Sequence, residues 1–169
     1  MRKGLMFTVA LLATVGIFLF SSSAILAQHR PMEEDVLTPI AKGYDLLGQG
    51  KYEAAQFEFE TALKKDRYNP FALNNLAALA EKQGKMKEAM AFLNDATKYA
   101  GDYKQKVVQT CFVGGLCTAA KPVKEVGPTS AILPIVKDNI KRLQEKMAKT
   151  PEKPVPSAPK PMVPPPPTK

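Results

Sequence analysis

The chain has 169 residues, of which 45% are hydrophobic and 24% charged, a composition that suits one small globular domain with extensions. The net charge of +8 is uneven, because residues 28–100 carry 10 Lys or Arg against 11 Asp or Glu, whereas residues 101–169 carry 12 against 5. Two cysteines are too few for a disulfide-dense scaffold, which excludes that class of small secreted protein.

Residues 1–27 have the layout of an export signal. Arg2 and Lys3 precede a long uncharged apolar run, which ends in small residues at Ala27. Two interpretations remain open: a cleaved signal peptide, or a retained membrane anchor through residues 4–27, since that length is enough to cross a bilayer. Both predict export, to the periplasm or to the periplasmic face of the inner membrane.

A polar linker is expected over residues 28–35, followed by four helices within residues 36–101. Thr38 and Pro39 indicate a helix start, and Asn69 with Pro70 repeats that signal. Glycine tolerates the left-handed conformation that ends a helix, so Gly50 and Gly84 indicate helix ends. The four expected helices cover residues 38–49, 52–65, 70–83 and 86–100.

A sequence pattern recurs in this region at a spacing of 34 residues. The recurring positions are Gly50, Lys51, Tyr52, Ala55, Phe59 and Ala62, then Gly84, Lys85, Met86, Ala89, Leu93 and Ala96. A period of this length is typical of stacked helix pairs. The pattern resembles the tetratricopeptide repeat family, because small and large residues alternate where paired helices approach closely. The resemblance implies two tandem repeats over residues 36–101.

Residues 102–148 are expected to cover the end of the repeats. Asp102 to about Phe112 is predicted as a capping helix, residues 113–128 as an irregular stretch, and a further helix to end at Ala148. In that last helix four apolar residues form a narrow seam: Val136, Ile140, Leu143 and Met147. The seam indicates packing on the repeats; self-association through residues 134–148 and a membrane-surface helix are the alternatives.

The predicted fold class is therefore all-α: two tandem repeat hairpins, a capping helix, a further C-terminal helix and a disordered Pro-rich tail. The tail, residues 149–169, is of low complexity and has nine prolines after residue 150. Such a composition buries too little apolar surface to fold and is typical of an extended spacer.

The resemblance also implies a partner-binding groove, formed by the first helix of each pair. Asn side chains there can pair with both the N–H and the C=O of an extended ligand, and aromatic residues supply contact area. The alternative is that these residues are ordinary core and surface positions. The predicted groove residues are Leu37, Ile40, Tyr44, Phe71, Asn74, Asn75 and Ala78.

Cys111 and Cys117 are predicted to form a disulfide, since an exported chain meets an oxidising compartment. Buried free thiols and a redox-active pair are the alternatives. No residue set has metal-site spacing, and no cofactor is expected. His29 is the only histidine, and no nucleophile–base–orienter set is found, so the chain is not expected to be an enzyme.

The predicted function is a non-catalytic scaffold or adaptor of the bacterial cell envelope, which holds a protein partner in the groove and assists assembly of a pilus, secretion or outer-membrane complex. The alternative is attachment of the basic C-terminal region to a polyanion, such as a cell-wall polymer or lipid headgroups. Nucleic acid is not an expected partner, because the C-terminal lysines lack interleaved aromatic residues.

Overall fold

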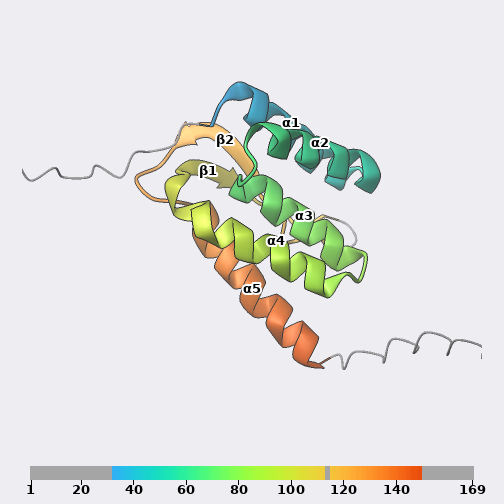
Figure 1. The fold of residues 1–169 in the computed structure, drawn as a ribbon. Helices are drawn as coiled ribbons and strands as arrows, with labels where there is room; N and C mark the ends of the chain where they lie inside the picture. Colours follow the sequence, from blue (N-terminus) through green and yellow to red (C-terminus); the bar gives the residue numbers. More distant parts are fainter. Residues whose placement is uncertain (1–31, 113–114, 150–169) are drawn as a thin grey trace, which may run out of the picture.

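The computed structural model describes residues 32–112 and 115–149. The predicted signal or anchor of residues 1–27 and the tail after residue 149 lie outside them. The elements are α1 (Glu34–Gly48), α2 (Tyr52–Lys65), α3 (Pro70–Lys82), α4 (Met86–Tyr99), a 3-10 turn (Ala100–Asp102), β1 (Gln105–Val108), β2 (Lys121–Val126) and α5 (Ile132–Lys149). The helices α1 and α2 form one hairpin, α3 and α4 a second, and the hairpins stack through α2 and α3 (Figure 1). The all-α fold class is confirmed, with one small two-stranded sheet added.

The turn inside each hairpin closes in the same way. Gly50 and Gly84 have φ values of 72° and 79°, which a residue with a side chain rarely adopts. The N–H of the next residue then donates to the carbonyl five residues earlier, at 3.0 Å for Lys51 and 2.9 Å for Lys85. This bond satisfies a carbonyl that the helix end leaves unpaired. The 34-residue spacing of the two glycines therefore produces two equivalent hairpins.

The first helix begins at Glu34, one turn earlier than predicted, so the expected linker of residues 28–35 and the cap at Thr38 are wrong in detail. Glu34 and Asp35 lie in the first turn, where negative charge favours a helix N-terminus. The Thr38 hydroxyl donates to the Glu34 carboxylate at 2.9 Å. Pro39 consequently lies inside the helix and is buried there. The helix lacks one backbone hydrogen bond at this position, because proline has no N–H to donate.

The paired helices approach closely at small residues. Ala55 of α2 and Ala89 of α4, at equivalent positions of the two hairpins, are both 0% exposed. Phe59 is also 0% exposed, and its ring lies against Gly43 of α1. These contacts form one hydrophobic core that extends from α1 to α5.

We expect Gly43→Ala to lower the free energy of unfolding by about 1–2 kcal/mol, because overpacking outweighs the gain in helix propensity. A Cβ at this position would lie 2.5 Å from Cε1 of Phe59, so the ring or the helix would have to move. Urea unfolding followed by circular dichroism measures the loss. Gly101→Ala is the control, because a Cβ there meets no atom within 4 Å. Equal losses in the two variants would contradict the close contact.

The predicted capping helix over residues 102–112 is wrong. After the 3-10 turn the chain becomes extended at Tyr103, and β1 pairs antiparallel with β2 in what was expected to be an irregular stretch. Gln105 is buried and Val108 is 45% exposed, so burial along these residues follows a strand and not a helix. β-branched valines favour the strand once a partner strand is present.

The helix that covers the end of the repeats is α5. It packs against α4 much as α3 packs against α2, and Figure 1 shows the two helices side by side. The hydroxyl of Ser130 accepts from the N–H of Leu133 at 3.2 Å, which ties the chain to the first turn of the helix. Val136 and Leu143 of the predicted seam are fully buried in the shared core. Self-association through residues 134–148 remains a prediction, and it would have to use the exposed faces of α5.

Candidate functional site

The inner face of the repeats, defined as the surface of α1 and α3 that carries the seven predicted groove residues, is covered by the chain itself. All seven residues are buried, with exposed fractions from 0% to 6%. The chain that returns from β1 to β2 lies over this face, and we call its residues 116–120 the groove segment. Leu116, Ala119 and Ala120 of this segment belong to the core. The predicted groove is therefore not an open surface in the structure, and its binding of a partner stays a prediction.

Asn75 binds the backbone of the groove segment through both ends of its amide. Its Nδ2 donates to the carbonyl of Ala120 at 2.9 Å, and its Oδ1 accepts from the N–H of the same residue at 2.8 Å. Both bonds go to main-chain groups of Ala120, so this contact recognises backbone and not a polar side chain.

Asn74 extends this contact by two residues along the groove segment. Its Nδ2 donates to the carbonyl of Thr118 at 2.8 Å. Its Oδ1 accepts from Nδ2 of Asn139, at 2.8 Å, and that amide also donates to the Thr118 carbonyl at 3.0 Å. The three asparagines are buried and form one connected set of hydrogen bonds. A buried polar network with every bond made holds its ligand in one position.

Asn139 is a site residue that the sequence analysis missed. It lies on α5 within the same turns as Val136 and Leu143, on the buried side of the helix. A polar residue inside an apolar seam was the available signal, because a buried amide needs a partner. The identity of that partner depends on how α5 packs on α3, which the sequence does not reveal.

Tyr44 of α1 binds the chain at Thr110, just before Cys111. Its hydroxyl accepts from the N–H of Thr110 at 2.8 Å and lies 2.9 Å from the hydroxyl of the same residue. The ring of Phe112 meets the Tyr44 ring edge-on, with the centroids 4.8 Å apart. The inner face therefore binds the chain both before and after residues 113–114.

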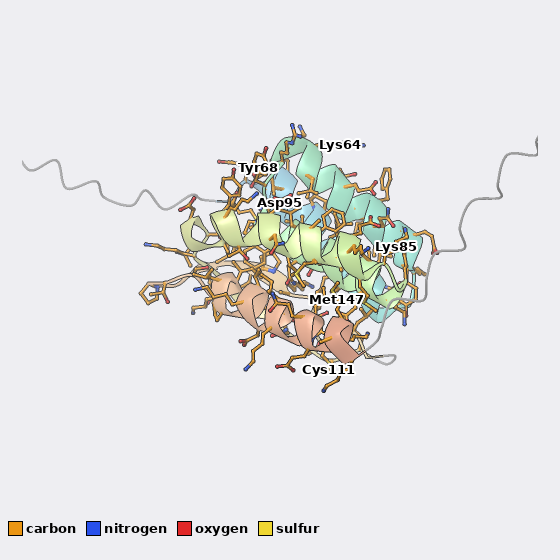
Figure 2. The ribbon with its side chains drawn as sticks, turned by 60° about the horizontal axis from the view of Figure 1, so that its bottom comes forward. Lys64, Tyr68, Lys85, Asp95, Cys111 and Met147 are labelled. Carbon is orange, nitrogen blue, oxygen red and sulfur yellow. A yellow bond between two sulfur atoms is a disulfide. The ribbon has the colours of Figure 1, made fainter. Side chains whose placement is uncertain are left out.

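The structure joins Cys111 and Cys117 by a disulfide, with their Cα atoms 4.0 Å apart. Both residues are exposed. Figure 2 shows Cys111 at the edge of the molecule opposite Lys64 and Tyr68, hence away from the outer side of α2. The side-chain amide of Gln109 donates to the Cys117 carbonyl at 2.8 Å, and this hydrogen bond also joins the chain before Cys111 to Cys117.

An ion cluster closes one end of the inner face. Glu81 of α3 binds the guanidinium of Arg142 through both carboxylate oxygens, and the ammonium of Lys146 lies 3.0 Å from one of them. The hydrogen bonds from Arg142 hold the pKa of Glu81 below its ordinary value, Lys146 adds to this effect, and burial opposes it. The cluster therefore joins α3 to α5 most strongly when Glu81 is ionised.

We expect Glu81→Gln to lower the free energy of unfolding by about 1–2 kcal/mol at neutral pH. The folded-state pKa lies below the unfolded one, so this stability is complete above the unfolded pKa of about 4.3 and is lost as pH falls through the folded value. Urea unfolding between pH 3 and 7 should show a shallower acid loss in the variant. Glu145→Gln, an exposed position of α5, is the control. Parallel pH curves for wild type and Glu81→Gln would contradict the assignment.

A hollow of about 620 Å³ lies between α1 and β2 and is open to solvent. Its α1 side includes Lys42 and Asp45, which correspond at the 34-residue spacing to Leu76 and Leu79 of α3. The α3 pair is buried and lines the hollow that α3 shares with α2, whereas Asp45 forms an ion pair with Lys121 of β2 at 2.7 Å. Polar residues here give the first helix a face suited to solvent, as terminal repeats require.

Within residues 32–112 and 115–149, no group of three His, Cys, Asp or Glu side chains is arranged to hold a metal ion. In the same residues no helix combines the length and the hydropathy needed to cross a bilayer. The predicted membrane segment of residues 4–27 lies outside this part of the chain.

A comparison with protein-family models matches residues 46–107 to the family described as tetratricopeptide repeat. The match spans the two hairpins apart from most of α1, and it agrees with the stacking seen in the structure. Residues 46–107, which carry most of the two hairpins, are thus similar to the tetratricopeptide repeat family, as the 34-residue pattern predicted. Searches of curated proteins and of solved structures gave no match.

Proposed function

We propose that this chain is a non-catalytic protein-interaction protein of the bacterial cell envelope, which helps to assemble a pilus, secretion or outer-membrane complex. Tetratricopeptide repeats generally mediate protein–protein interaction, and proteins of this family are typically non-catalytic scaffolds. The apolar N-terminal segment supports export, and the proline-rich tail supports a role as a spacer between this domain and another component.

One observation carries the interaction role. Asn74 and Asn75 hold residues 118–120 by hydrogen bonds to their backbone, at 2.8–2.9 Å. Hydrogen bonds to main-chain groups supply affinity for the backbone of a peptide, and the fit of its side chains supplies specificity. We propose that the partner presents a peptide segment to the inner face. In the structure the groove segment occupies this place, so the partner must take the position of residues 118–120.

Site-specific photo-crosslinking in living cells tests the interaction role. Lys82 is exposed and lines a hollow of about 270 Å³ together with Leu116 and Thr118, so a photoreactive residue there reaches a ligand on the inner face. Ala54, exposed on α2, is the control position. We expect adducts of defined mass from position 82 and none from position 54. Equal adducts from both positions would overturn the proposed inner-face site.

The export part of the proposal has its own test. Cell fractionation should place the chain in the envelope, and mass spectrometry of the intact protein should separate the two forms. Cleavage after Ala27 removes the first 27 residues, whereas a retained anchor leaves residues 4–27 in place and the chain in the membrane fraction. Recovery of the full-length chain from the cytosol would overturn export.

The ion pairs of the C-terminal half favour a protein partner over a polyanion. Five basic residues of this half are paired with carboxylates in the structure: Lys106, Lys121, Lys124, Arg142 and Lys146. Paired cations present less net charge to an acidic polymer. Polyanion attachment predicts binding to the envelope that falls steeply between 0.05 and about 0.5 M salt, because exposed charges are then screened.

A further inference from the structure

We propose that the groove segment is an internal ligand of the inner face, and that the Cys111–Cys117 disulfide keeps it there until a dithiol reductant cleaves the bond. This inference rests on the proposed function, because it assigns a means of control to the same site. The ligand class is an extended peptide that places two consecutive small residues where Ala119 and Ala120 now lie.

The chemistry of the contact supports the role of an internal ligand. The inner face binds the backbone of Thr118 and Ala120, and both alanines of the groove segment are 0% exposed. Methyl side chains leave room for close approach of the backbone to α3, so a peptide in trans needs small residues at these two positions. Leu116 is 4% exposed and anchors the segment on its other side.

The disulfide couples two contacts that are otherwise separate. Tyr44 binds Thr110 on the arm of the chain that precedes Cys111. The asparagines bind residues 118–120 on the arm that follows Cys117. With Cys111 and Cys117 joined, one arm cannot leave the inner face without drawing on the other. Once the bond is cleaved, each arm is held by its own contacts alone, and the groove segment exchanges with a competing peptide more readily.

The two sulfur atoms are accessible to a reductant, since both cysteines are exposed. In the proposed step a thiolate of the dithiol attacks one sulfur, the S–S bond breaks, and a mixed disulfide forms. The second thiol of the reductant then releases the chain. Two electrons and two protons pass to the protein, which gains two thiols, and the reductant becomes a disulfide.

Hydrogen exchange on the purified mature chain tests the release without a partner. After reduction by dithiothreitol, we expect the amide of Ala120 to exchange at least tenfold faster, whereas amides in the middle of α2 and α4 change less than twofold. Cys111→Ser with Cys117→Ser should behave like the reduced protein without any reductant. Unchanged exchange at Ala120 would overturn the proposal. Equal acceleration in α2 and α4 would also overturn it, because the disulfide would then support the whole fold.

A peptide probe tests the freed site. The probe is a fluorescent peptide of residues 115–121 with Cys117→Ser, and its control carries Ala120→Pro as well, which removes the N–H that Asn75 Oδ1 accepts. We expect the probe to bind the double-serine variant at least tenfold more tightly than the oxidised protein, and the control not to bind. Equal binding to both protein forms would overturn the control by the disulfide. Because neither test uses a cellular partner, a failure of crosslinking from position 82 remains a separate result, which bears on the proposed function.

Discussion

Ala55→Arg should unfold the repeat domain, with a loss of at least about 4 kcal/mol in the free energy of unfolding. Ala55 is 0% exposed on α2, a helix that packs against both α1 and α3. A guanidinium there must either remain buried without a partner or force the two helices apart, and a small domain has a total stability of only about 5–15 kcal/mol. Far-ultraviolet circular dichroism and urea unfolding measure the outcome.

Ala54→Arg is the matched control, because the preceding residue is exposed on the same helix. The same substitution there should change the free energy of unfolding by less than about 0.5 kcal/mol. In the second hairpin, Ala89 is 0% exposed and corresponds to Ala55, and exposed Ala91 of the same helix provides the control. A folded Ala55→Arg variant with an unchanged unfolding midpoint would contradict the close packing of α1 on α2.

Asn75→Ala should lower the free energy of unfolding by about 2–4 kcal/mol, the second largest effect that we expect. The variant loses two hydrogen bonds to the backbone of Ala120, and it leaves that buried N–H and C=O without their partners. Each unpaired buried group costs about 1–3 kcal/mol. Urea unfolding measures the total, and hydrogen exchange at Ala120 reports the local part.

Asn94→Ala provides the comparison for this prediction, since Asn94 is exposed on α4. Its loss should remain below about 0.5 kcal/mol. An Asn75→Ala variant as stable as Asn94→Ala would show that the groove segment leaves the inner face at little cost. Because Asn75 supports the fold as well as the site, this variant measures stability, and photo-crosslinking from position 82 measures partner binding.

The helix hairpins were predictable because their signals are local. Gly50 and Gly84 end helices by their own conformational freedom, and Asn69 caps α3 by accepting from two backbone N–H groups within three residues. Because the same pattern recurs after 34 residues, the assignment of one hairpin supports the assignment of the other. The start of α1 was misjudged because Thr38 and Pro39 imitate a cap, while the acidic residues one turn earlier also favour a helix start.

For the candidate site, the prediction concerned the pairing of two asparagine amides with the backbone of a partner. The amide of Asn75 pairs with both the N–H and the C=O of Ala120, and the amide of Asn74 donates to the C=O of Thr118, but both of these residues belong to the same chain. Whether a partner also binds there stays a prediction. The disulfide pair followed from cysteine count and export, whereas its position beside the groove segment did not.

The sequence by itself determined the repeats, their turns and the two asparagines, because each depends on residues no more than one repeat apart. Only the tertiary structure decided that residues 105–108 form a strand and not a helix, that α5 covers the repeats, and that the inner face is occupied. These outcomes depend on contacts between residues far apart in the chain, such as Lys121 with Asp45 and Lys124 with Glu34. Local propensity cannot anticipate such contacts, since their energy is gained only when distant segments have already come together.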